Sequence, residues 1–161
     1  MSPLFDVTEL VQMGVEDERT GVAFYSVLAE KTADAELRQQ YADLAEQERH
    51  HQKRFEQMLE DLGNVQATET YPGEYIAYLR AMLDSRALPD EATAQRMANE
   101  RADDPAASLD LALRFERDTL VLMNELRGMV PEKDRGTVDE LAREEQGHLV
   151  VLARAKEKLG S

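Results

Sequence analysis

Two carboxylate–imidazole pairs are the residues of this chain best suited to chemistry. Glu48 precedes His51 by three positions, and Glu145 precedes His148 by three positions, 97 residues further along. Residues three apart lie on one face of a helix, so each pair can present an oxygen and a nitrogen to the same point. A single Glu-x-x-His pair is common by chance. A repeated pair, however, indicates a metal site built from oxygen and nitrogen ligands.

Each pair is preceded by a lone glutamate in an otherwise apolar helical stripe. Glu18 lies between Val15 and Val22 at helical spacing, and Glu116 follows Ala112 in the same way. Burying an ionised carboxylate without a partner costs several kcal/mol. Four such groups on core-facing stripes therefore require positive charge between them, which two divalent cations would supply. Glutamates paired with Arg and Lys on a solvated face do not fit, because the stripe neighbours are apolar.

The sequence thus predicts a dinuclear centre. Its six predicted ligands are Glu18, Glu48, His51, Glu116, Glu145 and His148. We expect Glu48 and Glu145 to bridge the ions, with one terminal Glu and one His for each ion. Ligands without thiolate suit iron or manganese, with zinc as a substitute. We predict two iron ions per chain, because a ferrous pair can deliver two electrons to an oxygen–oxygen bond.

Four long amphipathic helices must position these side chains. Their apolar stripes predict helices over about residues 7–31, 34–62, 107–129 and 131–159. Gly63 is a suitable C-terminal stop for the second helix, and Ser108 is a candidate N-cap for the third.

The segment from about residue 64 to residue 106 is predicted to cross from one pair of helices to the other. It holds turn residues at 68–73, short helices over about 74–83 and 89–101, and a break at Asp103-Asp104-Pro105. The first short helix carries apolar residues that need a surface to cover: Tyr75, Ile76, Tyr78, Leu79 and Met82. A partner chain would supply it in a homodimer, or the helix could fold back onto its own bundle.

The two halves of the chain repeat one another. Leu44-Ala45 stands before Glu48 as Leu141-Ala142 stands before Glu145, and each half is a helix with one Glu, a turn and a helix with Glu-x-x-His. We therefore predict an all-α protein: one domain over residues 1–161, a four-helix bundle of two hairpins joined by a long crossover containing one or two short helices.

The composition excludes several classes of function. A net charge of −14 argues against binding to nucleic acid or to an anionic membrane. The absence of Cys excludes disulfides, thiolate ligands and iron–sulfur clusters. With no apolar run long enough to span a membrane and no secretory signal pattern, we expect a cytoplasmic protein.

Other residues near the predicted ligands carry weaker signals. Tyr25 could hydrogen-bond a bridging Glu and serve as a catalytic proton or electron shuttle, or could be a core tyrosine with a satisfied hydroxyl. Gly21 and Gly147 could make room for a small substrate or for close helix packing. His50 cannot point inward together with His51, so we expect it at the surface or behind the ligands.

Both halves carry the pattern of a known family. The motifs Glu18-x-x-Gly21-x-x-Phe24-Tyr25, Leu44-Ala-x-x-Glu48-x-x-His51, Phe115-Glu116 and Leu141-Ala-x-Glu-Glu145-x-x-His148 resemble the rubrerythrin family of the ferritin-like superfamily. This resemblance implies a non-haem di-iron oxidoreductase that reduces hydrogen peroxide, or dioxygen. The best-known rubrerythrins carry a rubredoxin domain with four Cys. Because this chain has none, we expect a separate electron donor, such as a rubredoxin.

The chain departs from the family pattern at Thr119. Rubrerythrins have there an extra Glu that exchanges with a His as the iron changes oxidation state, so Thr119 counts against efficient peroxidase activity. The alternative is a ferroxidase or iron-binding protein of bacterioferritin type, for storage or detoxification, which assembly into a cage would favour. Arg49 stands where bacterioferritin has its haem-binding Met, so no haem is predicted. A structural or regulatory protein with a vestigial, zinc-loaded site is a third interpretation.

Overall fold

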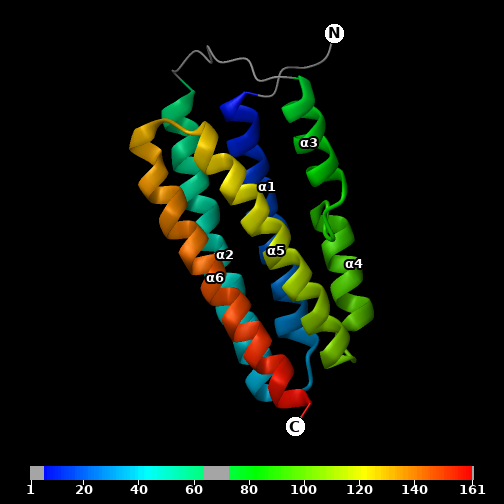
Figure 1. The fold of residues 1–161 in the computed structure, drawn as a ribbon. Helices are drawn as coiled ribbons and strands as arrows, with labels where there is room; N and C mark the ends of the chain where they lie inside the picture. The colour runs from blue at the N-terminus through cyan, green and yellow to red at the C-terminus, as the bar shows by residue number, and fades with distance from the viewer. Residues whose placement is uncertain (1–5, 64–72, 161) are drawn as a thin grey trace.

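The computed structural model describes residues 6–63 and 73–160, and the regular structure of these residues is entirely helical. Four long helices form a bundle: α1 (Val7–Lys31), α2 (Ala35–Leu62), α5 (Pro105–Met129) and α6 (Glu132–Leu159). Two shorter helices, α3 (Gly73–Asp84) and α4 (Glu91–Arg101), run along one side of it (Figure 1). The predicted all-α bundle of two hairpins and a crossover is confirmed. The predicted turn at residues 68–72 lies outside the described residues.

Aspartates begin most of the helices. The Asp6 carboxylate accepts a hydrogen bond from the backbone N–H of Glu9, and Asp34 caps α2 in the same way. The prediction of Ser108 as N-cap of α5 is wrong. Asp104 caps this helix by accepting from the Ala107 N–H at 3.1 Å, and Pro105 occupies the first turn, where its missing N–H costs nothing.

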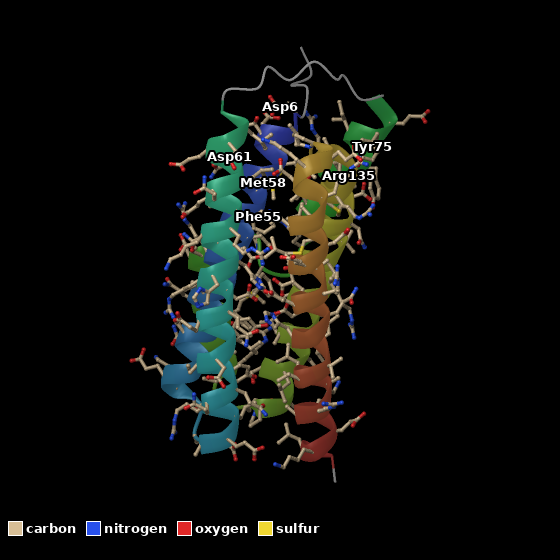
Figure 2. All side chains as sticks on the ribbon, turned by 90° about the vertical axis from the view of Figure 1, so that its left-hand side faces the viewer. Asp6, Phe55, Met58, Asp61, Tyr75 and Arg135 are labelled. Carbon is tan, nitrogen blue, oxygen red and sulfur yellow. The ribbon has the colours of Figure 1, made fainter. Side chains whose placement is uncertain are left out.

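The helices of each hairpin run antiparallel. In Figure 1, α1 descends and α2 ascends, α3 and α4 both descend, and then α5 ascends and α6 descends. One apolar cluster of α1, α2, α5 and α6 also contains Leu79 and Leu83 of α3, and a second contains Ala94 and Ala98 of α4. The crossover thus adds a second layer of helix against α1 and α5, whereas α2 and α6 form the side that faces the viewer in Figure 2.

The apolar residues of α3 fold back onto the bundle of their own chain. Ile76 and Leu79 are buried, and Tyr75 is half-buried, whereas Tyr78 is 45 % exposed. The hydroxyls of Tyr75 and Tyr78 both donate to the Glu125 carboxylate on α5, at 2.5 and 3.0 Å. A partner chain is therefore not needed to cover this helix, and the homodimer stays a prediction. In the described parts of the chain, no helix is long and apolar enough to cross a membrane.

Candidate metal centre

The four long helices bring all six predicted ligands together in the interior of the bundle. None of these residues is more than 2 % exposed. They are Glu18 on α1, Glu48 and His51 on α2, Glu116 on α5, and Glu145 and His148 on α6. One lone Glu and one Glu-x-x-His pair come from each hairpin, so the internal repeat of the sequence becomes a pseudo-symmetric cluster.

The cluster divides into two overlapping sets of ligand atoms. One set comprises Glu18, Glu48, His51 and Glu145, and the other comprises Glu48, Glu116, Glu145 and His148. Within each set, one atom per residue lies within 4.8 Å of every other. Two metal ions could therefore share Glu48 and Glu145, with Glu18 near one ion and Glu116 near the other.

The two imidazoles face the shared carboxylates through the same nitrogen. His51 Nδ1 lies 2.8 Å from Glu145 Oε1 and 3.4 Å from Glu48 Oε2. His148 Nδ1 lies 2.8 Å from Glu145 Oε2 and 3.4 Å from Glu48 Oε1. Each shared glutamate thus presents one oxygen to each histidine, as a bridging ligand would. The rings stack with centroids 5.5 Å apart.

The buried oxygens provide a test of whether a cation fits. Both carboxylate oxygens of Glu18, both of Glu48, and Oε2 of Glu116 and of Glu145 have no hydrogen-bond partner among the described residues. Buried polar atoms are almost always paired, and each unpaired one costs about 1–3 kcal/mol. A cluster of acceptor atoms that point at one another and lack donors fits two divalent cations, which would coordinate these oxygens.

The outer nitrogens of the two histidines are held by residues of the opposite hairpin. His51 Nε2 lies 2.6 Å from Glu144 Oε2, and His148 Nε2 lies 2.7 Å from Gln47 Oε1. An Nε2–H that donates to these oxygens leaves Nδ1 free as the metal-facing atom. Glu144 is half-exposed and still supports the site. His50 lies at the surface near Glu46, as expected.

The terminal carboxyls hold protons in the metal-free protein. Burial raises the pKa of Glu18 well above its usual range, and the negative charges of Glu48 and Glu145 raise it further. Burial, followed by the charge of Glu145, raises the pKa of Glu116 to about 8. Both groups are therefore neutral acids at neutral pH without metal.

The shared carboxylates and the imidazoles are ionised instead. Burial alone would raise the pKa of Glu48 and of Glu145, but the two histidines close to both carboxylates bring each pKa below its usual value. Burial alone would lower the pKa of His51, but the hydrogen bond to Glu145 and the nearby carboxylate of Glu48 raise it to about 10. The pKa of His148 is raised in the same way. Two imidazolium ions thus balance two carboxylates, and the metal-free cluster is neutral.

Tyr25 contacts the cluster directly. Its hydroxyl donates to Glu116 Oε1 at 2.5 Å, so the expected hydrogen bond goes to a glutamate of one set only and not to a shared, bridging glutamate. Burial, and then the charge of Glu116, raises the pKa of the phenol well above its usual value, which keeps it protonated. Its ring packs against Phe115 and stacks on Tyr41.

The two glycines near the ligands serve different purposes. A Cβ on Gly21 would lie 3.0 Å from the Phe115 ring and 3.3 Å from Glu48 Cγ, so this glycine permits close helix packing. A Cβ on Gly147 would meet nothing within 4 Å. Gly147 lines a cavity of about 380 Å³ between α2 and α6, together with Gln47, Glu144 and His148.

A buried acid beside the cluster was missed from the sequence. Asp17 is 2 % exposed, accepts a hydrogen bond from Thr119 Oγ1 at 2.7 Å and lies 3.4 Å from an Arg86 nitrogen. Burial raises its pKa to about 7, although Thr119 and Arg86 both favour the ionised form. Leu10, Gly14, Asp17, Gly21, Phe24 and Leu28 form a second stripe of buried residues on α1. That spacing was a usable signal.

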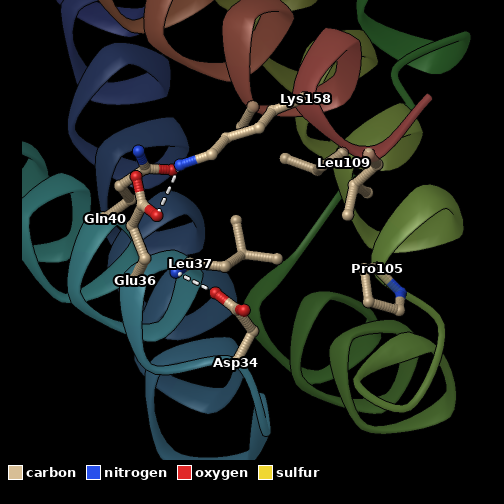
Figure 3. Close-up of a pocket in the computed structure, with 9 residues that line it drawn as sticks. Asp34, Glu36, Leu37, Gln40, Pro105, Leu109 and Lys158 are labelled. Atoms are coloured by element: carbon tan, nitrogen blue, oxygen red, sulfur yellow. Dashed lines mark hydrogen bonds and ion pairs between the residues drawn. The ribbon is translucent and has the colours of Figure 1, made fainter. Parts of the chain in front are cut away.

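Another pocket lies far from the cluster, at the end of the bundle where α1 meets α2. Asp34, Leu37, Pro105, Leu109 and Lys158 line this space of about 240 Å³, drawn in Figure 3. None of the six clustered residues reaches it. The ion pair between Lys158 and Glu36 crosses its rim at 2.6 Å.

Comparisons with known proteins agree with this geometry. Residues 9–156 match the family model described as Rubrerythrin. Among solved structures, the chain is similar to a ferritin-like diiron-carboxylate protein from Thermotoga maritima, with a TM-score of 0.77 and 25 % sequence identity over 98 % of each chain. Among curated proteins, none matches the chain.

Proposed function

Because this chain belongs to the rubrerythrin family of ferritin-like di-iron proteins, we propose that it is a di-iron oxidoreductase whose substrate is hydrogen peroxide. One observation carries this proposal: four carboxylates and two imidazoles are buried in two overlapping ligand sets, with most of their inward oxygens unpaired. Iron is the metal proposed because this ligand set has no thiolate and the reaction is a reduction. Manganese or zinc could occupy the same atoms.

Each residue of the cluster has a role in this proposal. Glu48 and Glu145 would be shared by the two ions, and Glu18 with His51 and Glu116 with His148 would complete the two sets. A ferrous pair would supply the two electrons that reduce hydrogen peroxide to two molecules of water. The reaction also consumes two protons, and the Tyr25 hydroxyl, 2.5 Å from Glu116 Oε1, is placed to pass protons through that carboxylate.

The test is rapid mixing of the protein loaded anaerobically with Fe(II), separately with hydrogen peroxide and with dioxygen. Iron stoichiometry is measured on the same sample. Two irons per chain, oxidised much faster by peroxide than by dioxygen, would support the proposal. Failure to bind iron stoichiometrically would refute the di-iron site itself. Oxidation at equal rates by both oxidants would refute the choice of substrate.

A ferroxidase for iron storage or detoxification is the second candidate, and Thr119 favours it. Threonine has no carboxylate that could exchange with a histidine ligand. The Thr119 hydroxyl donates a hydrogen bond to Asp17 instead. The six-residue cluster alone is also the set expected of bacterioferritin-type ferroxidases. In the same mixing experiment, faster reaction with dioxygen and continued oxidation beyond two irons per chain would favour this candidate.

Two partners belong to the proposal. A separate electron-donor protein, such as a rubredoxin, would return the irons to the ferrous state, because the chain has no Cys for a redox cluster of its own. A homodimer is proposed as the assembly. Light scattering during size-exclusion chromatography distinguishes a dimer from the many-subunit cage that iron storage would require.

A further inference from the structure

The two halves of the metal centre differ at one equivalent position of the repeat. Gln47 precedes Glu48 on α2, and Glu144 precedes Glu145 on α6. Each reaches across to the outer nitrogen of the other hairpin's histidine: Glu144 to His51 at 2.6 Å, and Gln47 to His148 at 2.7 Å. The geometry is nearly the same on both sides, but one acceptor is a carboxylate and the other is an amide.

This chemical difference makes the two imidazoles unequal as ligands. A carboxylate that accepts the Nε2–H raises the electron density of the ring and strengthens the bond from Nδ1 to a metal. A neutral amide accepts the same hydrogen with less effect. Arg54 lies 3.7 Å from the other oxygen of Glu144, which helps to hold that side chain against His51. Water also reaches Glu144, which is 51 % exposed, and weakens the effect without removing it.

A second difference acts in the same direction. The Tyr25 hydroxyl donates to Glu116 at 2.5 Å and draws electron density from that carboxylate. Glu18, its counterpart in the other set, has no such donor among the described residues. The set containing Glu18 and His51 therefore has the stronger terminal carboxylate and the stronger imidazole. The set containing Glu116 and His148 also borders the cavity between α2 and α6, since His148 lines it.

We infer that the two metal positions are inequivalent: the ion at Glu18 and His51 binds first and tightly, the ion at Glu116 and His148 is the exchangeable one, and Glu144 is the positioning residue that sets this order. The inference rests on the metal site of the proposed function and is independent of its substrate. Mutation of a residue behind a metal-bound histidine costs about 10–100-fold in affinity. The two binding steps should therefore differ by at least about tenfold.

The test is a stepwise titration of the metal-free protein with Zn(II) against a chelator of known affinity. Imidazole NMR signals identify which histidine responds to the first equivalent. The variants are Glu144→Gln, Gln47→Glu and the double exchange. E140Q is the matched control, because Glu140 is exposed and also pairs with Arg54, but it forms no ion pair with a histidine within the described parts of the chain.

In the native protein, the first equivalent should shift the His51 signals. E144Q should weaken the first step about tenfold or more, E140Q should leave it unchanged, and the double exchange should make His148 respond first. Equal steps, a first response at His148, or an effect of E140Q as large as that of E144Q would overturn the inference. Failure to bind two ions at all would refute the metal site as well, so the two failures are distinguishable.

Discussion

Loading the metal-free protein with two divalent ions is expected to release about four protons at about pH 7. The number of protons released on metal binding follows from the protons that the metal-free cluster holds. His51 and His148 each carry an extra proton because their pKa values are raised. Glu18 and Glu116 each carry one because burial raises theirs. A divalent ion at each position requires neutral imidazoles and ionised carboxylates, so all four protons must leave.

The metal-binding constant and the number of released protons both depend on pH. The apparent constant for binding both ions should rise by about four powers of ten per pH unit near neutrality, because protons compete with metal at four groups. The pKa of Glu116 is about 8, so this group is already ionised at higher pH in the metal-free protein. The release should therefore fall toward about three protons at about pH 9.

Calorimetric titration with Zn(II) in buffers of different ionisation enthalpy measures the released protons directly. Replacing Glu18 with Gln should reduce the count to about three, because an amide brings no proton to lose. Replacing the exposed Glu46 with Gln should leave the count unchanged. A release of two protons or fewer by the native protein would mean that the terminal carboxyls are ionised without metal, which would refute the reasoning.

Three further outcomes are expected of the metal-free protein in urea unfolding. Gly21→Ala should destabilise it by about 1–3 kcal/mol through overpacking. Gly147→Ala should stabilise it by up to about 1 kcal/mol, because the added Cβ would meet nothing and Ala favours a helix more than Gly does. Equal effects of the two substitutions would contradict this packing. Thr119→Val should cost about 1–3 kcal/mol by removing the donor to buried Asp17, and Thr119→Ser should retain it; equal stability of both variants would count against the bond. The pKa of His51 is raised from 6.5 to about 10, so the stability that its proton provides is complete below pH 6.5 and is lost as pH rises through this interval, by about 1.4 kcal/mol per unit. This decline should disappear on metal loading, and a flat profile without metal would refute it.

The helices and the ligand set could be predicted from the sequence because both depend on local spacing. Apolar stripes gave α1 its observed bounds, and Gly63 ends α2 as expected. The N-cap of α5 was misplaced because Ser108 and Asp104 both suit a cap by type. The structure decides between them through a distant partner: the Ser108 hydroxyl meets the buried Tyr41 hydroxyl at 2.8 Å.

Residues that support the ligands were harder to predict, because their partners come from other helices. Glu144 is exposed and looks like an ordinary surface acid on its own helix, yet it meets His51 of α2. Asp17 adjoins the predicted ligand Glu18 and lies on the second stripe of α1, and its two partners, Thr119 of α5 and Arg86 of the crossover, come from distant parts of the chain. Helix periodicity states which faces are apolar, and it does not state which helix will lie against each face.

The crossover also gives the metal centre a front and a back. Without α3 and α4, a single helical wall would separate the cluster from solvent on the α1/α5 side as well as on the α2/α6 side. Because α4 packs on α1 and α5, the wall there is two helices thick. The thin wall remains on the α2/α6 side, where Gly147 borders its cavity. Substitutions on the α2/α6 side should therefore change the rate at which small molecules reach the cluster. Substitutions in the crossover should instead change the rigidity of the α1/α5 side.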